Sequence, residues 1–248
     1  MFLLTPDYYQ IKDVHKKGRG VFALKEIPAG MIIGDYLGLI IKDEKIDALE
    51  KKHGNACYAM DYSDNDLSIF PLNIKAAGVH LINHSCAPNS DTYFYYGHTL
   101  FFTLRRILPG EEITIDYSFD PDNGDKKDLL HACFCGSSFC RGTMYTSDAK
   151  LRRYGAFCRQ ETKKQKFKLL KAGEVLLPLE KYPKEIKDNN IFNLFADREA
   201  TPISYDDKKM PPVSELRKRL RATGRRLNFK NLGLKVIAIA DGRIVVEK

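Results

Sequence analysis

The stretch INHSCAPN, residues 82–89, carries more chemistry than any other part of this 248-residue chain. It places two amides, an imidazole, a hydroxyl and a thiol directly after an apolar run. Taken alone, Asn83 and Asn89 also fit the role of turn formers, and His84 fits a buried, hydrogen-bonded histidine. The stretch therefore needs support from elsewhere in the chain before it indicates a reaction.

Two further motifs flank this stretch. Residues 17–23 are KGRGVFA, whose glycines permit the main chain to approach a cofactor closely, although Gly-x-Gly is also a common turn. Residues 110–117 are GEEITIDY, an alternating strand that holds the phenol of Tyr117 on a rigid support. The alternative for Tyr117 is an ordinary buried tyrosine at a strand end.

The cysteines indicate a metal site. Cys133, Cys135 and Cys140 are clustered and supply three thiolates, one short of a tetrahedral zinc site. Clustered thiols without a secretory signal favour metal binding over a disulfide framework, and unliganded reduced thiols are the alternative. Cys57 and Cys158 are interpreted as ordinary free thiols.

Together, these motifs and their order resemble the SET-domain protein-lysine methyltransferases that carry a post-SET zinc segment. The match covers about residues 8–145. The resemblance implies a β-rich α+β fold, a SET-type fold of several small sheets with a threaded (pseudoknot) segment. In such a fold Asn83 and His84 lie where the chain passes under another loop, an exception to the rule against threaded connections.

The resemblance also assigns residues. Tyr117 is the expected catalytic tyrosine, and it lines the substrate channel with Tyr58 and Phe119. Cys86 completes the zinc site with the three clustered cysteines. S-adenosylmethionine is expected to be bound by Lys17, Gly18, Arg19, Tyr58, Asn83, His84 and Phe134.

The implied function is transfer of a methyl group from S-adenosylmethionine to a lysine side chain in a histone or other basic protein. The lysine must arrive uncharged, and a dry aromatic channel beside a sulfonium disfavours the ammonium form. Alignment by Tyr117 then does most of the catalysis. Acidic residues that we expect to steer a basic peptide are Asp61, Asp64, Asp66, Asp120 and Asp122. The alternative function is a non-catalytic SET-fold binding module that recruits chromatin or nucleic acid.

Charge divides the chain into two expected domains. Residues 1–145 hold 15 Lys+Arg and 19 Asp+Glu, whereas residues 146–248 hold 25 and 13. The first would be the SET catalytic domain with its post-SET segment at about 131–145. The second would be a smaller basic α+β module whose Arg217–Arg226 region could meet nucleic acid or be a solvated surface.

Local patterns predict the elements. Lys42–His53 is expected to form a short amphipathic helix, and Lys150–Lys171 a basic helix. Asp241-Gly242 between two apolar runs predicts a hairpin. Strands are expected at 31–38, 56–62, 67–71, 92–96, 100–106 and 112–117.

The N-terminal apolar run is too short for a signal peptide, and no segment approaches about 18 apolar residues. We therefore expect a soluble, intracellular protein with no membrane partner. It would be nuclear in a eukaryote, and cytoplasmic or a secreted effector in a bacterium.

Overall fold

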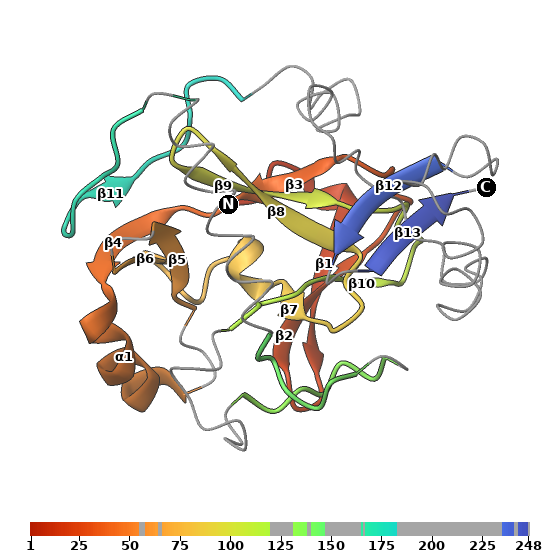
Figure 1. The fold of residues 1–248 in the computed structure, drawn as a ribbon, viewed down its shortest axis with the longest axis horizontal. Coiled ribbons are helices and arrows are strands. Elements are labelled where there is room, and N and C mark those ends of the chain that lie inside the picture. Colours follow the sequence, from red (N-terminus) through yellow and green to blue (C-terminus); the bar gives the residue numbers. More distant parts are fainter. Residues whose placement is uncertain are drawn as a thin grey trace, which may run out of the picture.

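The structure is a computed structural model that describes residues 1–54, 58–63, 66–119, 131–137, 140–146, 165, 167–182, 235–240 and 243–247. Short strands dominate this part of the chain, and helical turns are few (Figure 1). The elements are η1 (Pro6–Tyr8), β1 (Tyr9–Val14), β2 (Gly18–Ala23), β3 (Ile32–Asp35), β4 (Gly38–Lys42), η2 (Asp43–Lys45), α1 (Ile46–His53), β5 (Met60–Ser63), β6 (Leu67–Phe70), η4 (Val79–Leu81), β7 (Asn83–His84), β8 (Ser90–Tyr95), β9 (His98–Thr103), β10 (Glu112–Ile115), β11 (Val175–Leu176), β12 (Lys235–Ala240) and β13 (Arg243–Glu247).

The strands form several small sheets rather than one large one. Their orders are β1-β2-β10-β7, β11-β4-β6-β5, β3-β9-β8 and the pair β12-β13. Neighbouring strands are antiparallel except β7 and β10, which run parallel with Thr114 opposite Asn83 and Ile115 opposite His84. This β-rich arrangement of small sheets is the fold class that the motifs predicted.

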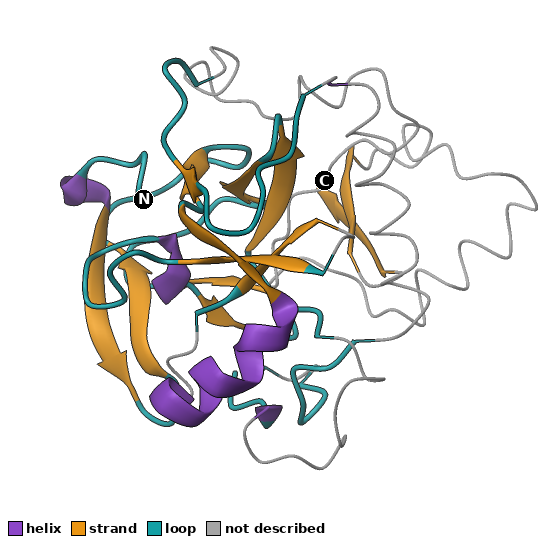
Figure 2. Ribbon diagram, turned by 90° about the vertical axis from the view of Figure 1, so that its left-hand side faces the viewer, coloured by secondary structure: helices purple, strands orange, loops and turns teal. Residues whose placement is uncertain are grey.

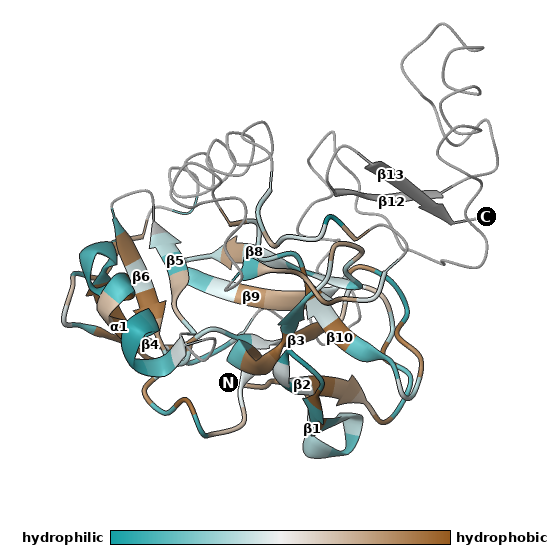
Figure 3. Cartoon of the chain, turned by 90° about the horizontal axis from the view of Figure 1, so that it is seen from below, coloured by the Kyte–Doolittle hydropathy of each residue, from teal (hydrophilic) through white to brown (hydrophobic). Residues whose placement is uncertain are grey.

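The described residues form two hydrophobic clusters, and the larger one lies between the sheets. Its completely buried members come from different sheets, and include Val21, Ile40, Ile69 and Ile113. Figure 3 shows hydrophobic residues along β6 and at the end of β2, whereas the surface of α1 is largely hydrophilic. Burying each such aliphatic side chain contributes about 1.5–3 kcal/mol, so this core fixes the strands that carry the polar motifs.

The predicted helix at 42–53 is confirmed as the turn η2 followed by α1. It ends at Gly54, which has a positive φ of 58°. None of its residues is buried, and it lies on the outside of the fold (Figure 2).

The single strand predicted at 31–38 is wrong, since β3 and β4 belong to different sheets. The chain changes sheet at Tyr36-Leu37, and Gly38 then packs directly against β6. A Cβ on Gly38 would lie 2.1 Å from the carbonyl oxygen of Phe70. A pattern of apolar residues and glycines cannot distinguish such a sheet change from a broken strand.

Residues 165–182 contact the small sheets. β11 pairs with β4, and the amide of Leu170 donates to the hydroxyl of Tyr62 at 3.1 Å. Residues 167–171 are not helical, so the end of the predicted helix at 150–171 is wrong, and its earlier part falls outside the described residues apart from Gln165. The division into two domains at residue 145 stays a prediction. The pairing of β11 with β4 and the contact between Leu170 and Tyr62 connect the two predicted domains.

The predicted C-terminal hairpin is confirmed, because β12 and β13 pair antiparallel across Asp241-Gly242. The basic Arg217–Arg226 region lies outside the described residues. The threading of the Asn83–His84 segment stays a prediction.

Candidate functional site

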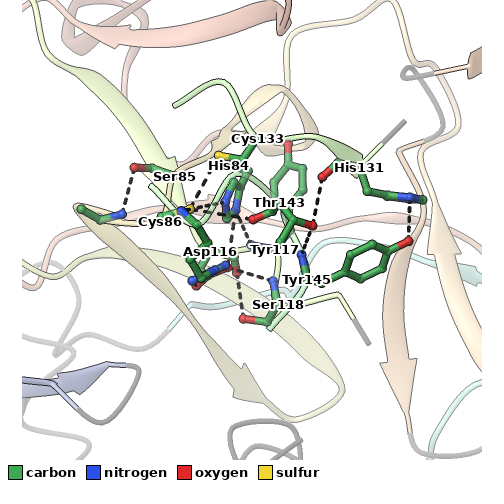
Figure 4. A network of polar contacts seen from close by, with 12 residues as sticks. His84, Ser85, Cys86, Asp116, Tyr117, Ser118, His131, Cys133, Thr143 and Tyr145 are labelled. Atoms are coloured by element: carbon green, nitrogen blue, oxygen red, sulfur yellow. Dashed lines mark hydrogen bonds and ion pairs between the residues drawn. The ribbon is translucent and has the colours of Figure 1, made fainter. Parts of the chain in front are cut away.

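The parallel pair of β7 and β10 brings the two central motifs together. Thr114 and Ile115 lie opposite Asn83 and His84, and the amide of Ser85 donates to the carbonyl of Ile115 at 2.8 Å. β10 continues into Asp116 and Tyr117, so the phenol follows directly from the strand that contacts the Asn-His pair. Two stretches some thirty positions apart in the chain therefore share one small region of the fold (Figure 4).

Asn89 strengthens this junction. Its Nδ2 donates to the carbonyl of Glu112 at 2.8 Å, and its Oδ1 accepts from the amide of Thr114 at 2.9 Å. The buried side chain thus pairs with both kinds of backbone group on β10. Asn89 therefore stabilises a strand. The alternative interpretation of the motif, in which Asn89 only forms a turn, does not account for these contacts.

Asn83 is buried against the glycine-rich strand. Its Nδ2 donates to the carbonyl oxygen of Arg19 at 3.2 Å and to Oε1 of Glu112 at 2.8 Å. The side chain therefore reaches from β7 to its neighbour β10 and on to β2. All three sequence motifs meet at this amide.

His84 is buried between Tyr117 and the first cysteine of the cluster. The amide of Tyr117 donates to Nδ1 at 3.1 Å, so Nδ1 is the acceptor nitrogen. Nε2 then carries the proton and lies 3.4 Å from Sγ of Cys86. One imidazole contacts both the candidate tyrosine and a candidate metal ligand, as Figure 4 shows.

The hydroxyl of Tyr117 donates to the carbonyl oxygen of Ile82 at 3.0 Å. Burial raises the pKa of this phenol, and the neighbouring hydroxyl of Tyr58 and the carboxylate of Glu112 raise it further. The phenol is therefore protonated at neutral pH. With its proton committed to Ile82, its oxygen has lone pairs to offer to another group.

Aromatic rings continue from Tyr117 along one side of the site. The rings of Tyr117 and Phe119 are 5.5 Å apart, and Phe119 meets the ring of His131 edge-on at 5.1 Å. Tyr58 is an electrostatic neighbour of Tyr117, and its ring contacts that of His80 at 5.0 Å. The three residues expected to line the channel are thus near one another.

The glycine-rich motif lies beside Asn83. Gly18 has a positive φ of 71°, and the guanidinium of Arg19 donates to the carbonyls of Ile74 and Lys75. Lys17 forms a largely buried ion pair with Glu112. Their roles toward a cofactor stay predictions.

Phe134 lies on the surface with 47% of its area exposed, and Nζ of Lys16 lies 5.0 Å from its ring centre. This contact joins the cysteine segment to the turn between β1 and β2. The predicted contact of Phe134 with S-adenosylmethionine is not tested by these contacts.

The four predicted cysteine ligands come together. Their Sγ atoms all lie within 4.8 Å of one another, and those of Cys86 and Cys133 are 3.6 Å apart. Four thiolates bound to a tetrahedral zinc lie about 3.8 Å from one another, since each Zn–S bond is about 2.3 Å. The candidate ligand set is Cys86, Cys133, Cys135 and Cys140.

Backbone amides also point at these sulfurs. The amide of Arg141 donates to Sγ of Cys86 at 3.3 Å, and that of Gly142 to Sγ of Cys140 at 3.4 Å. Burial acts to raise the pKa of Cys135, but backbone hydrogen bonds from Cys86 and Ser137 lower it to about 7. Hydrogen-bond donors favour the thiolate form that binds metals. Burial raises the pKa of Cys86 and Cys133, so these two thiols depend on a bound metal ion to become thiolates. The all-sulfur set and its close spacing therefore fit a four-thiolate metal site.

One contact between the cysteine segment and the tyrosine motif could not be predicted from the sequence motifs. The guanidinium of Arg141 binds the carboxylate of Asp116 through two hydrogen bonds of 2.8 Å each. Arg141 follows a cysteine ligand and Asp116 precedes Tyr117, so the pair connects the cysteine segment to the tyrosine. Glu112 was missed as well, although it lies within a quoted motif.

Of the acidic residues expected to steer a substrate, Asp61 and Asp66 are exposed on or beside β5 and β6. The other three, Asp64, Asp120 and Asp122, fall outside the described residues, as do Cys57 and Cys158. Within the described ranges, the structure contains no helix with the length and apolarity needed to cross a membrane.

The chain is similar to a protein family and to several named proteins. Residues 18–118 match the family model of the SET domain. Histone-lysine N-methyltransferase trithorax of Drosophila virilis is 34% identical over 142 residues, which are 54% of this chain and 4% of that protein. Histone-lysine N-methyltransferase 2B of Homo sapiens is 36% identical over 131 residues, 50% of this chain and 5% of that protein. Histone-lysine N-methyltransferase, H3 lysine-9 specific SUVH5 of Arabidopsis thaliana is 32% identical over 151 residues, which are 55% of this chain and 18% of that protein. The chain spans only a small part of these relatives.

Two solved structures are also similar. Arabidopsis thaliana SUVH6 in complex with SAM is 27% identical, with a TM-score of 0.43 over 55% of this chain and 33% of that one. KRYPTONITE in complex with mCHG DNA and SAH is 24% identical, with a TM-score of 0.44 over 55% and 29%.

Proposed function

We propose that this protein transfers a methyl group from S-adenosylmethionine to a lysine side chain of a histone or another basic protein, since residues 18–118 match the family model of the SET domain. The observation that carries the proposal is the convergence of Asn83, His84 and Tyr117 across the β7–β10 pair. A binding module without turnover would not need this arrangement.

In the proposed reaction, S-adenosylmethionine supplies an electrophilic methyl group on a positively charged sulfur. Tyr117 acts by alignment rather than as a base, because its raised pKa keeps the phenol protonated. Its hydroxyl proton is donated to Ile82, so its oxygen accepts a hydrogen bond from the incoming amine. This interaction orients the nitrogen lone pair.

The lysine must lose its proton before it reacts, since its ordinary pKa is about 10.4. Tyr58 and Phe119 flank Tyr117 and provide an aromatic, water-poor wall. Such surroundings disfavour the ammonium form of the amine. No carboxylate or imidazole of the chain is required as a strong base in this scheme.

We further assign the cofactor contacts to Lys17, Gly18, Arg19, Tyr58, Asn83, His84 and Phe134, and a structural zinc to the four cysteines. Zinc is supported by the all-sulfur ligand set, which is typical of structural zinc sites. This ion would hold residues 131–146 against the Asn83–Cys86 segment.

The homology to histone methyltransferases supports a histone-like substrate and a nuclear location. The basic residues 146–248 remain a proposed second module with a role in contacting nucleic acid. For the alternative of a non-catalytic chromatin-binding module, the described residues offer no observation in favour.

The proposal is tested by incubating the protein with isotopically labelled S-adenosylmethionine and a panel of histones, basic peptides and whole lysate. Transfer of label to lysine is expected, and Tyr117→Phe should reduce the rate by about 10²-fold while cofactor binding persists. The matched control is Tyr93→Phe, which removes a buried hydroxyl from β8 and should leave the rate unchanged. A wild-type protein that binds the cofactor and labels nothing in the panel would contradict the proposal.

A further inference from the structure

Glu112 is the residue at which all three motifs are joined. It begins β10, opposite Phe22 of β2. Its Oε1 accepts from Nδ2 of Asn83 at 2.8 Å, and its Oε2 forms the ion pair with Lys17. Only 17% of the Glu112 side chain and 11% of the Lys17 side chain are exposed. The carboxylate is therefore held by two partners in a largely buried position.

These contacts fix which end of the Asn83 amide faces which way. Both neighbours of Nδ2, the carbonyl of Arg19 and the carboxylate of Glu112, are acceptors only. The NH₂ group of the Asn83 side chain must point toward them, because only this end of the amide can donate a hydrogen bond. Both of its protons are used.

The carbonyl oxygen of Asn83 consequently points the other way. It accepts no hydrogen bond from the described residues, and it is not sealed from solvent. Asn83 thus presents an acceptor to a ligand. An acceptor binds an ammonium group and not a carboxylate.

Gly20 shows how closely this arrangement is packed. A Cβ at this position would lie 2.7 Å from Oε1 of Glu112 and 2.8 Å from Nδ2 of Asn83. Any side chain on Gly20 would displace one of these two groups. The glycine is needed here for space, and its neighbours are the two groups that orient the amide.

We propose that Glu112 is a positioning residue, which holds Asn83 so that its carbonyl oxygen binds the ammonium of the cofactor's amino-acid end. This inference rests on the proposed function and adds a residue to it. Lys17 has a supporting role, because its charge balances that of Glu112 next to the cofactor site. Without Glu112 only the longer hydrogen bond to the carbonyl of Arg19 holds the NH₂ group, so the amide can turn more easily, and a turned amide would present donors that repel an ammonium.

The test compares two ligands that differ only in the ammonium group. S-adenosylhomocysteine carries it, and deamino-S-adenosylhomocysteine keeps the carboxylate but lacks it. Dissociation constants for both are measured by titration calorimetry on the full-length, zinc-loaded chain. The wild-type protein should prefer S-adenosylhomocysteine by about tenfold or more, the effect of one hydrogen bond to a charged group.

In Glu112→Ala, binding of S-adenosylhomocysteine should weaken about tenfold while binding of the deamino analogue stays within about twofold, so the preference disappears. Glu112→Gln retains an oxygen that can accept from Asn83, and should keep most of the preference. The matched control is Glu111→Ala, the neighbouring residue, which binds Arg105 at 2.7 Å on the other side of the strand. It should leave both constants unchanged.

Equal weakening of both ligands in Glu112→Ala would assign a purely structural role and overturn the inference, and so would no weakening of either. Should Glu112→Ala fail to fold, Glu112→Leu, which fills a similar volume without an acceptor, replaces it. Lost preference in Glu112→Leu with retained preference in Glu112→Gln supports the inference, whereas retained preference in Glu112→Leu, or lost preference in Glu112→Gln, overturns it. If the wild-type protein binds neither ligand, the proposed function itself fails, which the other outcomes do not imply.

Discussion

The tyrosine site and the cysteine site lie side by side but are built differently. The tyrosine site, meaning Asn83, His84 and Tyr117, rests on paired strands. The cysteine site draws Cys86 from the same stretch and takes its other ligands from residues 131–146, which contain only isolated bridges and turns in the described ranges. Strand pairing can hold the first without a ligand, whereas the second depends on what its thiolates bind.

The difference shows how the two sites are coupled. His84 contacts Tyr117 on one side and Cys86 on the other, and the Arg141–Asp116 ion pair joins the two segments a second time. Both contacts reach Tyr117 or its neighbour. The position of the Tyr117 phenol should therefore depend on whether the cysteine segment is ordered. The pairing of β10, the strand that precedes Tyr117, should not depend on it.

Removal of the proposed metal should have the largest effect, and it should loosen the cysteine segment while the strands of the tyrosine site stay paired. With a strong chelator, or in Cys140→Ser at the exposed candidate ligand, amides of residues 131–146 should exchange with solvent about 10³-fold faster or more. Those of β9 and β10 should stay protected, because strand pairs and the core hold them. Hydrogen exchange followed by mass spectrometry measures both segments in one experiment. Uniform loss of protection across the chain would show that the two sites do not differ in this way.

Breaking the Arg141–Asp116 pair should have an intermediate effect. Asp116 is largely buried, and Asp116→Asn removes its charge from two hydrogen bonds. We expect a loss of about 3 kcal/mol in the free energy that docks the cysteine segment, and faster release of metal to a colorimetric chelator.

The control for this variant is Asp7→Asn, which breaks an ion pair with Lys25 between two exposed side chains. It should not change metal release, since exposed pairs contribute little. Release rates that are equal in the two variants would remove the ion pair from the account of coupling.

The strand-built site could be predicted from the sequence because its residues lie in the motifs themselves. GEEITIDY predicted a strand, and the alternation placed Ile113 and Ile115 in the core. The predicted strand at 112–117 ends at Ile115 in the structure. Beyond that point, Asp116 and Tyr117 bind Arg141 and His84 instead of a neighbouring strand, which periodicity does not reveal.

The contacts between motifs could not be predicted in the same way. Nothing in the local pattern shows that Glu112 binds Asn83 and Lys17, or that Leu170 reaches Tyr62. Such partners are chosen by the packing of the sheets. The four-cysteine site is the exception, because thiolate chemistry limits the partners that clustered cysteines can have.

Acid should reveal a weak point in the strand-built part through His80, whose ring packs against Tyr58. Burial lowers the pKa of His80 to about 4, and the cationic Arg19 contributes in the same direction. The unfolded chain, with an ordinary histidine pKa of about 6.5, therefore binds more protons between these two values. The stability that the neutral ring contributes is present above pH 6.5 and is lost as the pH falls toward 4.

We expect a loss of about 2 kcal/mol in the free energy of unfolding, after allowing for the partial exposure of the ring. Urea unfolding of wild type and His80→Gln at pH 7.5, 6.0, 5.0 and 4.5 measures it, since only the wild-type protein should show this part of the slope. Parallel pH curves for the two proteins would mean that folding does not lower the pKa of His80, and that the fold tolerates a charged ring beside Tyr58.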